Sequence, residues 1–263
     1  MPDTAHSPRA KKSLGQHFLR SAAICERIAA LLQPSPADRI LEIGPGPGAL
    51  TRALETLPHA SLVLIEKDRH WARLHRSGLH TQSVLMDALH IAWQRLDFPC
   101  KIVGNLPYNI ASALIWDCVS QAVGLTRAVF MVQKEVGERL TACSGKKAYG
   151  ALSVWVQNFA KPHFEFIVKR SAFTPPPEVD SAVVSFEPLP QCEQPEHPKA
   201  LSQLLRICFQ QRRKQLGGIF RRADLPATAL EALDICPSRR PESLSPAEFQ
   251  QLSLFLRACP PPG

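Results

Sequence analysis

The stretch that decides the fold is Leu41-Glu42-Ile43-Gly44-Pro45-Gly46-Pro47-Gly48-Ala49-Leu50. Its first residues are typical of a strand, a glycine-rich turn follows, and apolar residues then recur at helical spacing at Leu50, Ala53, Leu54 and Leu57. This order predicts a strand, a tight loop and a helix. Because glycine lets the backbone come close to a ligand, such a turn after the first strand of a parallel sheet predicts a site for a nucleotide-like cofactor.

The glycines alone do not decide which cofactor that is. The loop satisfies the relaxed dinucleotide pattern, and Glu66 has the spacing of about 20 residues expected for a ribose-binding acid. The two prolines of the loop, however, lack the N–H groups that bind a pyrophosphate. Glu42 adds a carboxylate, which repels phosphate but suits the sulfonium and ammonium groups of S-adenosylmethionine. The loop therefore favours a methyl donor over NAD, with a purely structural glycine turn as the third interpretation.

Length and composition are those of an ordinary globular protein. The chain has 263 residues, 45% of them hydrophobic and 21% charged, so one large domain and a smaller one are expected. No apolar run approaches the roughly 18 residues of a membrane span, and the segment after Lys12 is not the apolar core of a signal peptide. We therefore expect a cytoplasmic protein without a membrane partner. The eight cysteines form no C-x-x-C pair, so no metal site is expected.

The net charge of +8 and the isoelectric point near 9.2 indicate a polyanionic partner. Residues 198–263 hold ten Lys/Arg but five Asp/Glu, so the last quarter of the chain carries most of the excess. The basic runs within it are Arg212-Arg213-Lys214, Arg221-Arg222 and Arg239-Arg240. For any single pair, a solvated helix face is the simpler explanation.

Strands and helices alternate through the first two thirds of the chain. Ser21 is the predicted N-cap of a helix that ends at Leu32. After the glycine loop, the expected strands are 62–65, 83–86, 101–104 and 127–132, with a helix at 110–120. This alternation predicts an α/β fold with a mostly parallel, doubly wound sheet. Two later strand-like runs, 164–168 and 179–186, are expected to form an antiparallel edge.

Prolines cluster between residues 188 and 198, which predicts a linker, and the pattern beyond it is helical. Apolar residues at helical spacing indicate helices over 201–209, 227–233 and 246–256. The sequence therefore predicts a large domain at 1–187, a proline-rich linker at 188–198 and a small, basic, all-helical C-terminal domain at 199–263.

Polar residues end four of the predicted strands: Glu42, Glu66, Asp87 and Asn105. The carboxyl ends of parallel strands meet at one edge of a sheet, where ligands bind. A single acid there is often only a helix cap, but four polar ends in succession indicate a site. Glu66 can accept both hydroxyls of a ribose, Asp87 can accept the amine of an adenine, and Glu42 lies near the positive methionine end of the same cofactor.

The string Asn105-Leu106-Pro107-Tyr108 is the sharper signal. The exocyclic amine of a base is a poor nucleophile because its lone pair is delocalised into the ring. An asparagine carbonyl and a backbone carbonyl that accept its two hydrogens would pull the nitrogen toward tetrahedral geometry and aim its lone pair at a methyl donor. Pro107 fixes the backbone for this, and Tyr108 offers a face on which a flipped base stacks. The alternative is an Asn-x-Pro turn beside a buried tyrosine.

Six strings spread over nearly the whole chain carry a resemblance to a known family. They are Lys12-Ser-Leu-Gly-Gln-His-Phe-Leu19, the glycine loop, Asn105–Tyr108, Gln133-Lys-Glu-Val136, Lys147-Ala-Tyr-Gly150 and Phe173-Thr-Pro-Pro-Pro-Glu-Val-Asp-Ser-Ala-Val-Val184. In this order they resemble the ribosomal RNA adenine dimethyltransferase family, most closely its bacterial branch that acts on small-subunit ribosomal RNA.

The resemblance implies a Rossmann-like methyltransferase that uses S-adenosylmethionine. Its substrate would be the exocyclic amines of two adjacent adenosines in a hairpin loop near the 3′ end of 16S ribosomal RNA, and its partner the assembling small ribosomal subunit, with a role in subunit biogenesis. Residues 1–187 would then bind the cofactor and catalyse, and residues 199–263 would bind RNA. No feature of the sequence indicates an oligomer, so a monomer is expected.

Two alternatives stay open. The nearest is a large-subunit ribosomal RNA dimethylase of the antibiotic-resistance type, although the long helical tail and the Phe173-Thr-Pro-Pro-Pro tract favour the small subunit. The other is a non-catalytic assembly or nucleic-acid-binding factor on the same fold, which the intact Asn105–Tyr108 loop disfavours.

The resemblance also assigns roles to residues, in addition to the loop and strand ends above. The cofactor would be bound by His17, Leu19, Glu42, Gly44, Gly46, Glu66, Asp87, Ala88 and Asn105. The target base would be held by Asn105, Pro107, Tyr108 and Phe173, unless Phe173 is an ordinary core residue. The clustering of positive charge, rather than the resemblance, predicts contacts to RNA phosphates from Lys11, Lys12, Arg212, Arg213, Lys214, Arg221 and Arg222, which makes binding salt-dependent.

Two positions depart from the family pattern. Residue 17 is His where many relatives have Asn, so a hydrogen bond there becomes sensitive to pH. Gly217-Gly218 stands where an asparagine is common, which affects a local cap rather than the chemistry.

Overall fold

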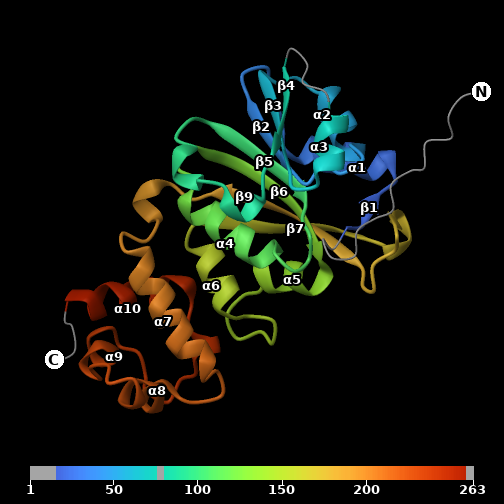
Figure 1. The fold of residues 1–263 in the computed structure, drawn as a ribbon. Helices are drawn as coiled ribbons and strands as arrows, with labels where there is room; N and C mark the ends of the chain where they lie inside the picture. Colours follow the sequence, from blue (N-terminus) through green and yellow to red (C-terminus); the bar gives the residue numbers. More distant parts are fainter. Residues whose placement is uncertain (1–15, 76–79, 259–263) are drawn as a thin grey trace, which may run out of the picture.

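The computed structural model describes residues 16–75 and 80–258 (Figure 1). A twisted seven-stranded sheet has the order β4-β3-β2-β5-β6-β9-β7 within these residues. The strands are β4 (Thr81–Leu85), β3 (Ser61–Glu66), β2 (Arg39–Ile43), β5 (Cys100–Asn105), β6 (Leu125–Gln133), β9 (Ser181–Pro188) and β7 (Ala160–Val168). The first five are mutually parallel, and β9 is antiparallel to both of its neighbours. The predicted α/β class with a mostly parallel, doubly wound sheet is confirmed.

The two late strands pair in antiparallel fashion, as the sequence predicts. The strand that comes second in the chain, β9, inserts between β6 and β7, so β7 forms the edge. All of β9 from Ser181 to Phe186 is buried, which agrees with its near-continuous apolar sequence.

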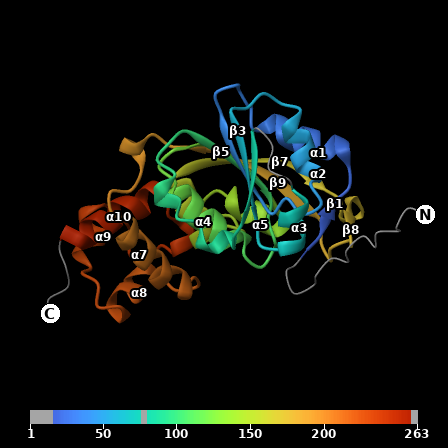
Figure 2. The ribbon, with the colours of Figure 1, turned by 45° about the horizontal axis from the view of Figure 1, so that its top comes forward.

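Helices cover both faces of the sheet because alternate residues of the central strands point to opposite sides (Figure 2). On one face, α1 (Ala22–Leu31) and α2 (Ala49–Glu55) pack on residues such as Ile40 and Val103. On the other face, α4 (Ala111–Gln121), α5 (Lys134–Leu140) and α6 (Ala151–Gln157) pack around Ile102 and Phe130. A short helix, α3 (Arg69–Leu74), lies beside β3 and β4. Ser21 caps α1 as predicted, since its Oγ accepts the Ile24 N–H at 3.4 Å.

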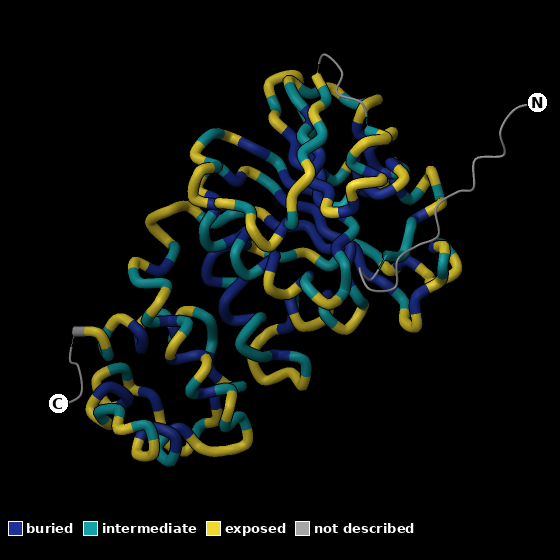
Figure 3. Tube along the Cα trace, in the orientation of Figure 1, coloured by how far each residue is buried: buried dark blue, intermediate teal, exposed yellow. Residues whose placement is uncertain are grey.

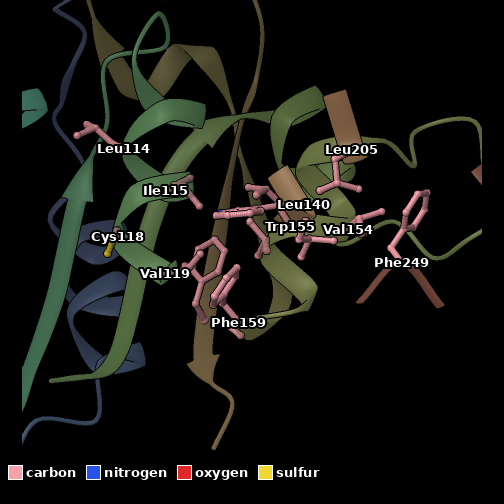
Figure 4. Packing of buried hydrophobic residues seen from close by; sticks show 14 of the residues in the cluster. Leu114, Ile115, Cys118, Val119, Leu140, Val154, Trp155, Phe159, Leu205 and Phe249 are labelled. Atoms are coloured by element: carbon pink, nitrogen blue, oxygen red, sulfur yellow. The ribbon is translucent and has the colours of Figure 1, made fainter. Parts of the chain in front are cut away.

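The chain after the sheet forms four helices in the part that the structure describes. These are α7 (Pro198–Gln210), α8 (Leu216–Arg222), α9 (Thr228–Ala232) and α10 (Pro246–Ala258). Their buried side chains belong to the same apolar cluster as the α4–α6 face of the sheet, and this cluster includes Trp155, Leu205 and Phe249 (Figure 4). The buried stretches of the tube drawing continue from the sheet into these helices (Figure 3). The division of the chain into two domains by a linker at residues 188–198 stays a prediction. In the structure, the sheet and the C-terminal helices share one hydrophobic core.

Several elements were not predicted from the sequence. They are the short helices α3, α5, α6 and α8, and a two-stranded antiparallel sheet of β1 (Phe18–Leu19) and β8 (Phe173–Thr174). Across the described ranges, no helix is long and apolar enough to cross a membrane.

Gly104→Ala should destabilise the protein, because an added Cβ would lie 2.7 Å from the Ile43 carbonyl oxygen on the neighbouring strand. Overpacking of this kind costs about 1–3 kcal/mol, and each kcal/mol lowers Tm by roughly 2–4 °C. Gly218→Ala in α8 is the control, since a Cβ there meets nothing within 4 Å and the helix gains up to about 1 kcal/mol. Thermal unfolding measures both, and equal Tm values for the two variants would contradict the tight packing at Gly104.

Candidate active site

A pocket lies at the carboxyl ends of β2, β3, β4 and β5, where polar strand ends were predicted to converge. Nine of the predicted site residues line it: His17, Gly44, Gly46, Glu66, Asp87, Ala88, Asn105, Pro107 and Tyr108. They come from four strand ends and from the segment before β1. Parallel pairing explains the convergence, because each strand delivers its last residue to the same edge of the sheet.

The Glu66 carboxylate connects two loops of this pocket. Its Oε2 accepts the Gly46 N–H at 3.0 Å, and its Oε1 accepts the Asp68 N–H at 2.7 Å. The side chain is only 6% exposed, and this burial raises the pKa of Glu66, opposed by the two backbone hydrogen bonds. Glu66 therefore fixes the glycine loop relative to the end of β3.

The glycine loop approaches the pocket in a conformation that side chains rarely allow. Gly44, Gly46 and Gly48 have φ values of +69°, +51° and +80°. Their N–H groups are all used inside the protein, by the Ile65 carbonyl, the Glu66 carboxylate and the Pro45 carbonyl. The loop thus has no glycine N–H left for a pyrophosphate. This geometry disfavours the dinucleotide interpretation and fits a ligand whose nucleoside end is held by carboxylates.

Asp87 lies just after β4, and each of its carboxylate oxygens has a partner within the protein. Lys67 Nζ lies 2.6 Å from its Oδ2, and the Leu89 N–H donates to its Oδ1 at 3.1 Å. The hydrogen bond from Lys67 is the main reason why the pKa of Asp87 lies below its ordinary value. The carboxylate is therefore ionised and faces the pocket beside Ala88, which begins a short 3-10 turn.

The Asn105–Tyr108 string turns directly from β5 into α4. The Leu106 N–H donates to the Met131 carbonyl at 3.1 Å, and the Pro107 carbonyl accepts the N–H groups of Ile110 and Ala111, which starts the helix. Asn105 Nδ2 donates to the His17 carbonyl at 2.8 Å, so its Oδ1 is the acceptor end of the amide.

The strap, defined as residues 16–19, adds Gln16, His17 and Phe18 to the lining of the pocket. Its β1 part pairs with β8, and His17 Nδ1 donates to the Pro175 carbonyl at 2.9 Å. The His17 ring stacks on Tyr108 with centroids 5.7 Å apart, and Phe18 packs edge-on against Trp71. The Tyr108 hydroxyl shares a 2.7 Å hydrogen bond with Ser181. The strap thus contacts both the cofactor side and the Asn105–Tyr108 side.

Three of the residues predicted to bind the cofactor or the target base do not line this pocket. Glu42 is buried, accepts the Thr51 hydroxyl at 2.7 Å and lines a small adjoining cavity together with Leu19. Burial raises the pKa of Glu42 to about 8, so it is mostly uncharged at neutral pH. Phe173 is 2% exposed, sits opposite Leu19 in the β1–β8 pair and packs in the core.

Other pocket residues were missed by the sequence analysis. They are Gln16, Phe18, Ile43, Ile65, Lys67, Met86, Leu89, Leu106, Asn109 and Ile110. Most directly precede or follow a predicted site residue, so the same strand-end argument was the available signal. Lys67, which follows Glu66, is the charged member of this group.

A second hollow in the C-terminal helices is basic. Five cations surround it, which we call the basic cradle: Lys147, Arg212, Arg213, Lys214 and Arg222. Its other lining residues are Gly145, Phe209, Gln210, Gln211 and Glu242. Glu242 pairs with Arg212 at 2.6 Å. Arg213, Lys214 and Arg222 are exposed. Arg221, which precedes Arg222 on helix α8, is exposed as well. Lys11 and Lys12 lie outside the described residues. No group of three or more metal-binding side chains occurs in the described ranges.

The strand order and the acid-lined pocket at the strand ends define a Rossmann-like methyltransferase. The family model described as ribosomal RNA adenine dimethylase matches residues 7–256. The chain belongs to this family and is a ribosomal RNA adenine dimethyltransferase, which confirms the resemblance and the enzyme class predicted from the sequence.

Curated relatives match over nearly the whole chain. Ribosomal RNA small subunit methyltransferase A of Nitratidesulfovibrio vulgaris strain Hildenborough is 54% identical over 92% of this chain and 94% of its own. The protein of the same name from Lawsonia intracellularis is 50% identical over 93% of both chains. Among solved structures, a dimethyladenosine transferase from Plasmodium falciparum has a TM-score of 0.80 at 28% identity, with 92% of this chain and 98% of that chain covered. The 23S rRNA methyltransferase ErmE shares the fold, with a TM-score of 0.69 at 24% identity, covering 91% of this chain and 99% of its own.

Glu42→Gln should stabilise the protein increasingly as the pH rises. The pKa of Glu42 is about 8 in the folded state against 4.5 ordinarily, so the unfolded chain loses this proton first. The stability that Glu42 contributes is complete below pH 4.5 and is lost as the pH rises through about 8, by up to about 1.4 kcal/mol per pH unit. Gln cannot ionise and avoids this loss.

Thermal unfolding at pH 5 and pH 8 checks this prediction. The Tm advantage of Glu42→Gln over the wild type should be larger at pH 8. Glu26→Gln, an exposed position on α1, should show no such trend. A constant difference between Glu42→Gln and the wild type at both pH values would contradict a buried, protonated Glu42.

Proposed function

We propose that this protein transfers methyl groups from S-adenosylmethionine to the exocyclic amines of two adjacent adenosines of small-subunit ribosomal RNA. The convergence of Glu66, Asp87 and Asn105 on one pocket carries this proposal. The small subunit is favoured because curated relatives that are 50–54% identical over at least nine tenths of the chain bear that subunit in their names.

The pocket fits the proposed cofactor from its nucleoside end. Glu66 presents a carboxylate for the ribose hydroxyls, and ionised Asp87 presents one for the adenine amine. The strap residue His17 and the loop residues Gly44 and Gly46 would close over the remainder. When bound, S-adenosylmethionine supplies a methyl group on a positively charged sulfur. Leu19 and Glu42 would support the glycine loop from the adjoining cavity.

On the target side, Asn105 is the residue that would hold the reacting amine. Its Nδ2 is fixed by the His17 carbonyl, so Oδ1 is left to accept a hydrogen from the amine. The Leu106 carbonyl would accept the second hydrogen, on a backbone that Pro107 fixes at the start of α4. Two acceptors aimed at one nitrogen favour the geometry in which its lone pair points at the methyl group. No strong general base is needed.

Tyr108 and Phe173 are proposed to stack on the flipped base. His17 covers one side of the Tyr108 ring, so the base would use the other side. Phe173 is buried behind the β1–β8 pair, and its ring would reach a base only if β8 shifts. Its role as second stacking face therefore depends on a movement of the strap and β8 when RNA binds.

The basic cradle, with Arg221 beside it, is proposed to bind RNA phosphates. Among the described residues, the one ion pair of a cradle cation is that of Arg212 with Glu242, and Arg213, Lys214 and Arg222 are exposed. Such contacts position the RNA without reading its sequence. The basic cradle and the acid-lined pocket have no lining residue in common. The two sites, of opposite charge, would therefore bind different ligands.

Asn105→Ala should lower methyl transfer to undermethylated small subunits by about 100-fold or more, because one acceptor of the reacting amine is lost. Binding of the subunits should stay close to wild type. Gln121→Ala, at the opposite end of α4, is the matched amide control and should retain full activity.

Radiolabel incorporation into purified small and large subunits measures this effect. Undiminished transfer by Asn105→Ala would contradict the proposed role of the amide. Wild-type activity confined to large subunits would instead support a dimethylase of the antibiotic-resistance type.

Replacing both Arg213 and Lys214 by Ala should weaken RNA binding and flatten its salt dependence. Removing two phosphate contacts lowers the slope of log K against log salt by about 1.4–1.8. The control pair is Arg95→Ala with Lys161→Ala, which are exposed near the amino ends of the parallel strands. Filter binding at several salt concentrations tests this, and an unchanged slope for the cradle variant would argue against the cradle as an RNA site.

A further inference from the structure

Lys67 is a charged pocket residue without a role among the predictions from the sequence. It follows β3 directly, and Asp87 lies just after the neighbouring parallel strand β4. Their side chains meet with Nζ 2.6 Å from Oδ2, and both residues line the pocket. Lys67 is 57% exposed and Asp87 18% exposed, so the pair lies at the mouth of the pocket rather than in the core.

The hydrogen bonds of Asp87 leave a defined part of its carboxylate for a ligand. An ionised carboxylate has about four acceptor positions, two on each oxygen. Lys67 takes one on Oδ2, and the Leu89 N–H takes one on Oδ1. Lys67 is the dominant partner of the carboxylate. Both oxygens are therefore fixed in direction, and each keeps an acceptor position for a donor in the pocket.

We infer that Lys67 is a positioning residue that sets both the affinity and the base selectivity of the methyl-donor site by orienting Asp87. This inference rests on the proposed function, in which the adenine of the donor binds at Asp87. An oriented, ionised carboxylate accepts a hydrogen from the amine of adenine. The same carboxylate repels the carbonyl oxygen that hypoxanthine has at that position. Lys67 thus helps the site to prefer adenine over hypoxanthine.

Isothermal titration calorimetry with S-adenosylhomocysteine and S-inosylhomocysteine tests this on the full chain. Lys67→Met keeps the length of the side chain but removes its charge, and it should bind S-adenosylhomocysteine about three- to fivefold more weakly. Its affinity for S-inosylhomocysteine should stay close to wild type, so the preference for adenine shrinks by the same factor. Lys67→Arg should restore both values, because it returns a charged donor to Asp87.

A double-mutant cycle separates positioning from a general loss of structure. In an Asp87→Asn background, Lys67→Met should change the affinity for S-adenosylhomocysteine by less than twofold, since its partner charge is already absent. Lys101→Met is the matched control. Lys101 pairs with Asp38 at 2.8 Å at the amino ends of the strands, and its loss should leave both affinities unchanged.

The outcomes distinguish this inference from the proposed function. Absence of S-adenosylhomocysteine binding by the wild type would overturn the proposed cofactor. Wild-type binding with an unchanged or tighter Lys67→Met variant would overturn the role of Lys67 alone. Two further outcomes would overturn the role of Lys67. In the first, Lys67→Met weakens the binding of S-adenosylhomocysteine and S-inosylhomocysteine by the same factor, so the lysine does not act on base selectivity. In the second, Lys67→Met has the same effect on affinity in the wild-type and Asp87→Asn backgrounds, so the lysine does not act through Asp87.

Discussion

The architecture of the pocket depends on one buried carboxylate, that of Glu66. Burial of a carboxylate is costly unless its oxygens are hydrogen-bonded, and here each oxygen accepts a backbone N–H from a different loop. One bond fixes the glycine loop, and the other fixes Asp68, which caps α3 through the His70 N–H and accepts Gln16 of the strap. A single side chain therefore sets the relative positions of the loop, the end of β3 and the strap. The same oxygens remain at the pocket wall.

The strap joins the cofactor side of the site to the target side. The Phe18 ring lies so close to Gly46 that a Cβ there would be 2.9 Å from it, while the His17 carbonyl holds the Asn105 amide. The His17 ring, in turn, donates to the Pro175 carbonyl beside β8. The glycine loop and Asn105 are therefore both in contact with the strap, through its adjacent residues Phe18 and His17.

The parts of the site that follow local rules were predictable from the sequence. Glu66, Asp87 and Asn105 each end a strand, and parallel pairing alone brings them together. The β1–β8 pair was not predictable, because it joins segments more than 150 residues apart and each strand has only two residues. His17 was named only through a family resemblance for the same reason. Helix α8 was missed because Gly217 and Gly218 lower its helix propensity, and its stability comes from the burial of Leu216, Ile219 and Phe220.

Glu42 shows how burial alters the meaning of an acid in a sequence motif. Its neighbours in β2 are buried on both faces, so its side chain points to Thr51 of α2 and is desolvated, whereas Asp87 at an open strand end is kept ionised by Lys67. Three ionised carboxylates at one sheet edge would repel one another strongly in a medium of low dielectric constant. A protonated Glu42 removes that repulsion and still accepts a hydrogen bond that holds the loop helix in place. The remaining negative charge of the site lies at Glu66 and Asp87, where we propose that the nucleoside end of the cofactor binds.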